Sequence, residues 1–117
     1  MDESILITIK KMLGIAPEDG AFDTDIITHI NTVINDLYQL GIGSGSFFIE
    51  DGSEEWSDYV EDIERYMAVK DYIYIKTKLI FDPPLSSFLI ENLKKRLDEL
   101  EFRLLVQKDV EIQNGEV

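Results

Sequence analysis

The sequence predicts an all-α fold, a small antiparallel helical bundle of about four helices with a glycine-rich loop that contains a short extended segment. Three observations predict this fold. Apolar residues recur at steps of three and four along four stretches, which is the spacing of one helical face. Glycine or proline separates most of these stretches from one another. The length of 117 residues allows one domain with one hydrophobic core.

The first predicted helix covers residues 2–13. Its apolar face is formed by Ile5, Leu6, Ile9, Met12 and Leu13. Asp2, Glu3 or Ser4 can cap its start, because their side chains accept hydrogen bonds from the free N–H groups of a first turn. Gly14 is expected to end this helix, and a loop continues to residue 21.

The second predicted helix covers residues 23–40. Its apolar stripe contains Ile26, Ile27, Ile30, Val33, Ile34, Leu37 and Tyr38. Asp23, Thr24 and Asp25 supply an N-cap and negative charge at the helix start, where both are stabilising. Gly41 and Gly43 are expected to end the helix. A flexible loop follows over residues 41–52, with one short extended piece at Phe47, Phe48 and Ile49.

The third stretch, residues 53–82, contains neither glycine nor proline. We expect a short helical turn near Trp56 and then a long helix over residues 61–81. Residues 72–81 also alternate like a strand and are rich in β-branched and aromatic side chains. We predict a helix because residues 62–70 have helical spacing and no breaker separates them from residues 72–81. Since residues 66–81 are mostly apolar or tyrosine, this helix should be buried on more than one side.

Asp82, Pro83 and Pro84 then break the chain, and Phe81 is expected inside a tight corner at this point. A last helix should start at Ser86 or Ser87 and end near residue 106. Its seam contains Leu89, Leu93, Leu97, Leu100 and Leu104. Residues 1–106 thus form the predicted helical domain. Residues 107–117 have little apolar content and are predicted to be a flexible tail.

The charge balance excludes several classes of function. The chain has 24 acidic and 11 basic residues, for a formal net charge of −13. This charge argues against a protein that grips nucleic-acid phosphates and against docking on an anionic membrane. No apolar run approaches the roughly 18 residues of a membrane span, and the N-terminal residues lack the positive charge of a signal peptide. Without cysteine the chain can form neither disulfides nor thiolate metal sites.

The candidate catalytic and ligand-binding groups do not form a recognisable motif. His29 is the one histidine, and a helix-surface or packing role is expected for it. A dense acidic stretch lacks the ordered spacing of a calcium loop; it contains Glu50, Asp51, Glu54, Glu55, Asp58, Glu61, Asp62 and Glu64. The glycine-rich run at residues 41–45 follows a helix and lacks the lysine of a phosphate-binding loop. We therefore expect no enzyme, no metal and no cofactor, and we interpret the acidic stretch as a solvated or partner-facing surface.

The order of several segments resembles a known family. Residues 69–104, VKDYIYIKTKLIFDPPLSSFLIENLKKRLDELEFRL, combine a tyrosine-rich helix, the break FDPP, and Ser86, Ser87 and Phe88 at the opening of the last helix. Residues 10–31 fit as well, and so does Trp56 with Tyr59 after the glycine-rich loop. Together these features resemble the head–tail connector proteins of tailed bacteriophages.

This resemblance implies an all-helical structural protein of the virion, at the interface of head and tail, which is assembled in the host cytoplasm. Such subunits form a homo-oligomeric ring below the portal protein, and the ring provides the surface on which the tail-side completion or stopper protein docks. DNA passes through the channel without sequence-specific binding. The label of DNA-packaging protein then describes a position in the particle, because no motor motif is present.

We expect the subunit or portal interface to use aromatic residues of the loop and its surroundings together with basic residues of the last helix. The candidates are Phe47, Phe48, Ile49, Trp56, Tyr72, Lys94, Arg96 and Arg103. Acidic and basic groups lie on different elements and can therefore meet head-to-tail between neighbouring subunits. An alternative of a different class is a small acidic helical binding or regulatory module, for example an inhibitor that mimics DNA.

Overall fold

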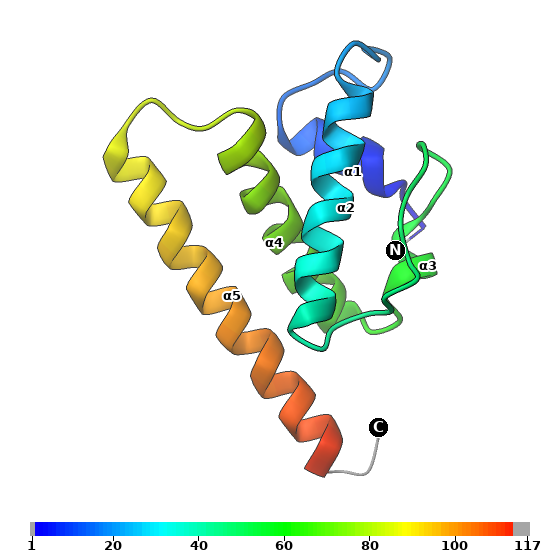
Figure 1. The fold of residues 1–117 in the computed structure, drawn as a ribbon, viewed down its shortest axis with the longest axis vertical. Coiled ribbons are helices and arrows are strands. Elements are labelled where there is room, and N and C mark those ends of the chain that lie inside the picture. The colour runs from blue at the N-terminus through cyan, green and yellow to red at the C-terminus, as the bar shows by residue number, and fades with distance from the viewer. Residues whose placement is uncertain (1, 114–117) are drawn as a thin grey trace.

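The computed structural model describes residues 2–113, and the side chains of residues 2–107 (Figure 1). Its helices are α1 (Ile5–Met12), α2 (Asp23–Gln39), α3 (Trp56–Tyr59), α4 (Ile63–Phe81) and α5 (Ser87–Gln113). The described residues contain no strand, only an isolated bridge between Ser4 and Glu55. The predicted all-α bundle of about four helices is confirmed, with α3 as the short turn expected near Trp56.

Helix α4 lies at the centre of the bundle and contacts α1, α2 and α5. Its buried residues point in several directions around the helix axis and are Ala68, Val69, Tyr72, Ile73, Ile75 and Thr77. On one side the Lys76 ammonium bonds the Asp36 carboxylate of α2 at 3.2 Å. On another side the Tyr72 hydroxyl donates to Glu101 of α5 at 2.7 Å. The prediction of a helix buried on more than one side is therefore confirmed.

The end of α1 is joined to the start of α2 by a buried ion pair. The Lys10 side chain is 1% exposed, and its ammonium lies 2.8 Å from Asp23 Oδ1. The same ammonium donates to the Pro17 carbonyl oxygen at 3.0 Å. The predicted capping role of Asp23 was wrong, because Phe22 occupies the N-cap position without a side-chain hydrogen bond. Asp23 is instead the first helical residue, where its charge is favourable at the helix N-terminus and its carboxylate neutralises Lys10.

The other predicted ends of these two helices agree with the structure. The Ser4 hydroxyl accepts a hydrogen bond from the Ile7 N–H at 3.2 Å and caps α1. Gly14 and Gly41 have φ values of 82° and 86° and follow the last turns of α1 and α2. These left-handed conformations cost little for glycine, so the chain can leave each helix there.

Helix α5 runs further than the sequence analysis predicted. It continues to Gln113 instead of ending near residue 106, because no glycine or proline interrupts residues 87–113. Residues 107–113 are therefore helical, and the rest of the predicted tail, residues 114–117, lies outside the described residues. The predicted seam holds from Leu93 to Leu104, but Leu89 is 50% exposed. Figure 1 shows the reason: α4 and α5 stand apart at the corner of residues 82–86.

Phe81 lies at the rim of the core and is not enclosed by it. The ring is partly buried and packs edge-to-face on Phe22 at 5.4 Å between centroids and on His29 at 6.4 Å. The expectation that Phe81 lies inside the corner is met only in part, because the ring packs against the core but remains partly exposed. His29 has the packing role that the sequence analysis expected.

The central position of α4 generates a stability prediction. Ile73→Ala should lower the free energy of unfolding by about 2–5 kcal/mol, since it leaves a cavity in the core. Phe81→Ala should cost less than the about 3–5 kcal/mol typical of an enclosed phenylalanine. Urea denaturation of both variants and the wild type measures the two losses. An equal or larger loss for Phe81→Ala would show that the corner contributes more to the core than the structure indicates.

The buried ion pair generates a second prediction. Asp23→Ala should destabilise the protein by about 2–4 kcal/mol, because it leaves the Lys10 ammonium buried and unpaired while Asp23 itself is 34% exposed. Lys10→Met should cost less, since methionine fills a similar volume without a buried charge. Thermal and urea unfolding compare the two variants. A larger loss for Lys10→Met would contradict this account.

Candidate interaction surfaces

Three of the eight predicted interface residues lie in the core of the subunit. Ile49, Trp56 and Tyr72 are each 1% exposed or less. The Trp56 indole N–H donates to the Thr8 hydroxyl at 3.1 Å, and the Tyr72 hydroxyl bonds Glu101. Both side chains therefore join elements within one subunit. Their assignment to an interface is corrected, because a buried side chain offers no surface to a neighbour.

The glycine-rich loop is fastened to α2 by the side chain of Asn31. Its Nδ2 donates to the Ile49 carbonyl oxygen at 2.9 Å, and its Oδ1 accepts from the Ile49 N–H at 2.8 Å. Ile42 and Ile49 are both 1% exposed, so the loop contributes to the core at two points. The sequence analysis treated this loop as flexible and Ile49 as accessible. The structure replaces that view with a loop anchored by apolar burial and by two hydrogen bonds.

The residue between two anchored positions of the loop faces solvent. Phe47 stacks on Tyr59 with ring centroids 4.7 Å apart, and Ile49 is buried. Phe48 between them is 56% exposed. Gly43 contributes to this arrangement, because a Cβ there would lie 2.8 Å from the Tyr59 ring. We call residues 47–51 the Phe48 loop.

Many carboxylates of the acidic stretch bond the backbone of their own segment. Glu54 accepts hydrogen bonds from the N–H groups of Glu50 and Asp51 at 2.8 and 3.3 Å. Asp51 accepts one from the Ser53 N–H at 2.8 Å, and these bonds with Ser53 lower the pKa of the Asp51 carboxyl. Asp58 and Asp62 accept from the N–H groups of Glu55 and Glu64. The stretch therefore holds the connection from α2 to α4 in shape. Among the described residues, no group of three or more potential ligands could hold a metal ion.

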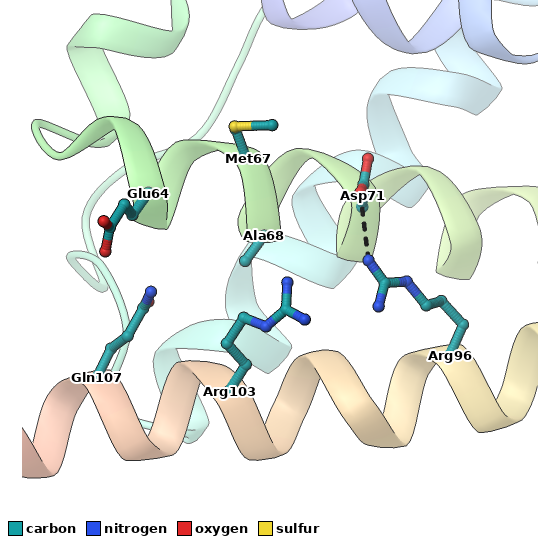
Figure 2. Close-up of a pocket in the computed structure, with 7 residues that line it drawn as sticks. All are labelled: Glu64, Met67, Ala68, Asp71, Arg96, Arg103 and Gln107. Atoms are coloured by element: carbon teal, nitrogen blue, oxygen red, sulfur yellow. Dashed lines mark ion pairs between the residues drawn. The ribbon is translucent and has the colours of Figure 1, made fainter.

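A groove lies between the N-terminal half of α4 and residues 96–107 of α5, with a volume of about 300 Å³ (Figure 2). Its lining residues are Glu64, Met67, Ala68, Asp71, Arg96, Arg103 and Gln107. Arg96 lies 3.9 Å from Asp71 and 3.2 Å from Glu99. Figure 2 shows the Arg103 side chain reaching from α5 into the groove, and no carboxylate of the described residues lies within ion-pair distance of it. We call this the Arg103 groove.

A second depression adjoins the Arg103 groove on the outer face of α5. Its volume is about 440 Å³, and Glu99, Phe102, Arg103, Val106 and Gln107 line it. Phe102 is 71% exposed and Val106 is 42% exposed. Lys94, another predicted interface residue, is largely solvent-exposed and approaches Glu91 at 4.0 Å. The basic candidates Lys94, Arg96 and Arg103 thus share helix α5, and their role at an interface stays a prediction.

A third accessible surface is apolar and lies at the corner between α4 and α5. It consists of Phe22, Ile80, Leu85, Phe88 and Leu89, all at least 47% exposed. Leu85 projects fully into solvent from the connecting turn. We call these residues the corner surface. The sequence analysis missed it, although a leucine between a double proline and a serine pair is a local signal of an exposed apolar side chain.

The family model described as "Phage connector protein" matches residues 5–111. No curated protein and no solved structure matches the chain. Within residues 2–113, none of the helices has the length and apolar character needed to cross a membrane.

The Asn31 contacts generate a prediction about the loop. Asn31→Ala should lower the free energy of unfolding by about 1–3 kcal/mol, because it leaves both polar groups of the Ile49 backbone without their partner. Amide exchange at Ile49 and cleavage by proteases within residues 41–55 should both accelerate. Asn35→Ala is the matched control, an exposed asparagine one turn further along α2. Equal behaviour of the two variants would show that the Asn31 contacts do not hold the loop.

Proposed function

The chain belongs to the phage connector protein family, and on this premise we propose that it is a structural subunit of the head–tail connector of a tailed bacteriophage. In this proposal, copies of the chain form a closed ring below the portal protein. The ring continues the DNA channel and offers its far side to the tail-side completion or stopper protein.

The shape of the subunit supports assembly in a ring. The molecule measures 45 × 35 × 20 Å, so it is a flat body. Figure 1 shows α5 along one edge and the connection between α2 and α4, with α3, at the opposite edge. Two unlike edges favour a head-to-tail contact, and a repeated head-to-tail contact closes into a ring when its rotation permits.

The charge of the subunit supports a channel through which DNA moves. At a net charge of −13 the protein repels phosphates on average. A conduit must let the duplex slide, whereas a protein that neutralises many phosphates binds it tightly. The acidic excess therefore favours passage of DNA over retention of it.

The corner surface is the candidate for contact with the portal or with the tail-side protein. A group of exposed apolar side chains often marks a site of contact with another protein. Leu85 and Phe88 are the most exposed members, at 106% and 73%. In Figure 1 the connection between α4 and α5 lies on the other side of the molecule from α3 and the connection that leads to it.

The test of the proposed function adds purified protein to DNA-filled, tail-less heads that carry the cognate portal. Wild type should bind the portal vertex as a ring in electron micrographs and should make the heads competent for tail attachment. Leu85→Ser with Phe88→Ser should reduce tail-competent particles by about tenfold or more, because two apolar anchors are lost. Ile63→Ser is the control, since Ile63 is also exposed but lies outside the corner surface.

Two outcomes of this test would count against parts of the proposal. Failure of the wild type to bind the vertex would contradict the connector function. Normal activity of the double variant would remove the corner surface from the interface. Far-UV circular dichroism of each variant shows whether the helices remain intact.

A further inference from the structure

The Phe48 loop presents an aromatic side chain in a fixed position. Asn31 holds the backbone of Ile49 at both polar groups, and Phe47 stacks on Tyr59. Phe48 lies between these anchors and remains 56% exposed. An exposed apolar group that is already ordered loses little entropy on binding, so it is suited to act as an anchor for a partner.

An acidic group next to Phe48 is free to pair with a cation. The side chain of Glu50 is exposed and accepts no hydrogen bond from the described residues, whereas the Asp51 carboxylate is bonded to Ser53. The loop therefore offers an aromatic ring and, two residues later, an unengaged carboxylate. A complementary site needs an apolar floor and a cation without an ion-pair partner of its own.

The Arg103 groove has both features. Met67 and the neighbouring Phe102 provide exposed apolar surface. Arg103 has no carboxylate partner among the described residues, in contrast to Lys10, Lys76 and Arg96, which are paired within the subunit. Glu64 also lines the groove, and its negative charge would repel an acidic loop. The positive charge of Arg103 is therefore needed for such a loop to enter.

The high net charge restricts where two copies can meet. At −13 per subunit, most contacts between copies place acidic surface against acidic surface. Residues 87–107 of helix α5 are less acidic than the rest of the chain, because four basic residues, Lys94, Lys95, Arg96 and Arg103, balance four acidic ones there. The Phe48 loop and α5 belong to opposite edges of the flat molecule (Figure 1).

We propose that the Phe48 loop of one copy docks into the Arg103 groove of the next copy. Phe48 packs on the apolar surface around Met67 and Phe102, and the Glu50 carboxylate pairs with the Arg103 guanidinium. Because donor and acceptor surfaces lie on opposite edges, each added copy presents a new groove and a new loop. The inference rests on the proposed ring function and specifies its interface.

Disulfide trapping tests this contact directly, because the chain contains no cysteine. Ser46→Cys lies beside the Phe48 loop, and Glu99→Cys lies in the depression next to the Arg103 groove. The double variant, bound to filled heads and mildly oxidised, should give a ladder of covalent multimers on a non-reducing gel. The control pairs Ser46→Cys with Glu18→Cys, an exposed position in the connection between α1 and α2, and should give no ladder.

Mixing single-cysteine proteins in solution makes the test independent of the heads. The Ser46→Cys and Glu99→Cys proteins should form the mixed dimer in preference to either symmetric dimer. Arg103→Glu in the Glu99→Cys protein should reduce the mixed dimer by about tenfold or more, since it places like charges opposite Glu50. When Glu50→Arg is added to the Ser46→Cys protein, it should again form the mixed dimer with the Glu99→Cys protein that carries Arg103→Glu. Phe48→Ser should reduce the mixed dimer without rescue by charge reversal.

The outcomes separate this contact from the proposed function. Heads that incorporate the protein while the Ser46–Glu99 pair gives no ladder would overturn the contact and leave the connector function intact. A ladder with the Glu18 control, or no rescue by charge reversal, would also overturn the contact. If the wild type never binds heads, the connector function fails, and the mixed-dimer experiment still decides whether the loop enters the groove.

Discussion

Helix α4 is apolar around most of its circumference, so it cannot lie on a surface and must be covered from several sides. Helices α1 and α2 cover one part of it, and α5 covers another. Tyr72 illustrates the constraint, because its ring is buried while its hydroxyl reaches Glu101 on α5. The remaining helices take their positions from the need to enclose this one helix. Burial of α4 also leaves α5 at the edge of the molecule, with α4 as its main neighbour.

The edge position of α5 explains why one helix has both a core seam and an accessible face. Leu97, Leu100 and Leu104 are buried against α4. No other helix within residues 2–113 covers the opposite face, and Phe102 and Arg103 are accessible there. Phe102 is a large apolar side chain on this free face, and exposed apolar groups of this kind often mark a contact with a partner. In the assembly that we propose, a neighbouring subunit covers this face.

The connection between α2 and α4 shows how polar groups can order a loop that is rich in glycine. Asn31 satisfies the Ile49 backbone, and carboxylates of Asp51 and Glu54 satisfy N–H groups that have no helical partner. The acidic stretch therefore combines two physical effects. Its hydrogen bonds stabilise the loop locally, while its charge contributes to repulsion between copies, which salt screens. Assembly should consequently depend on ionic strength and on the few contacts in which opposite charges meet.

Much of the helical architecture could be predicted from the sequence because its signals are local. Spacing of apolar residues, Ser4 as a cap, and Gly14 and Gly41 as stops placed α1 and α2 to within a few residues. The helix at residues 72–81 also followed from the absence of a breaker. The same signal was present up to Gln113, where α5 ends, but the low apolar content after residue 106 led us to predict a flexible tail instead of a helix.

The candidate surfaces depended on contacts between residues far apart in the chain, which a pattern of neighbours does not reveal. Lys94, Arg96 and Arg103 could be placed on one helix from the sequence, because spacing along a helix is local information, and their role at an interface stays a prediction. The sequence pattern did not distinguish Ile49, Trp56 and Tyr72 from accessible side chains. Each of them bonds a residue far away in the sequence, and these partners are Asn31, Thr8 and Glu101 respectively. The sequence by itself determined the helices, their order and the charge of the subunit. Only the tertiary structure decided which apolar side chains the core encloses and which remain for a partner, because burial depends on how the helices pack and not on the residue alone.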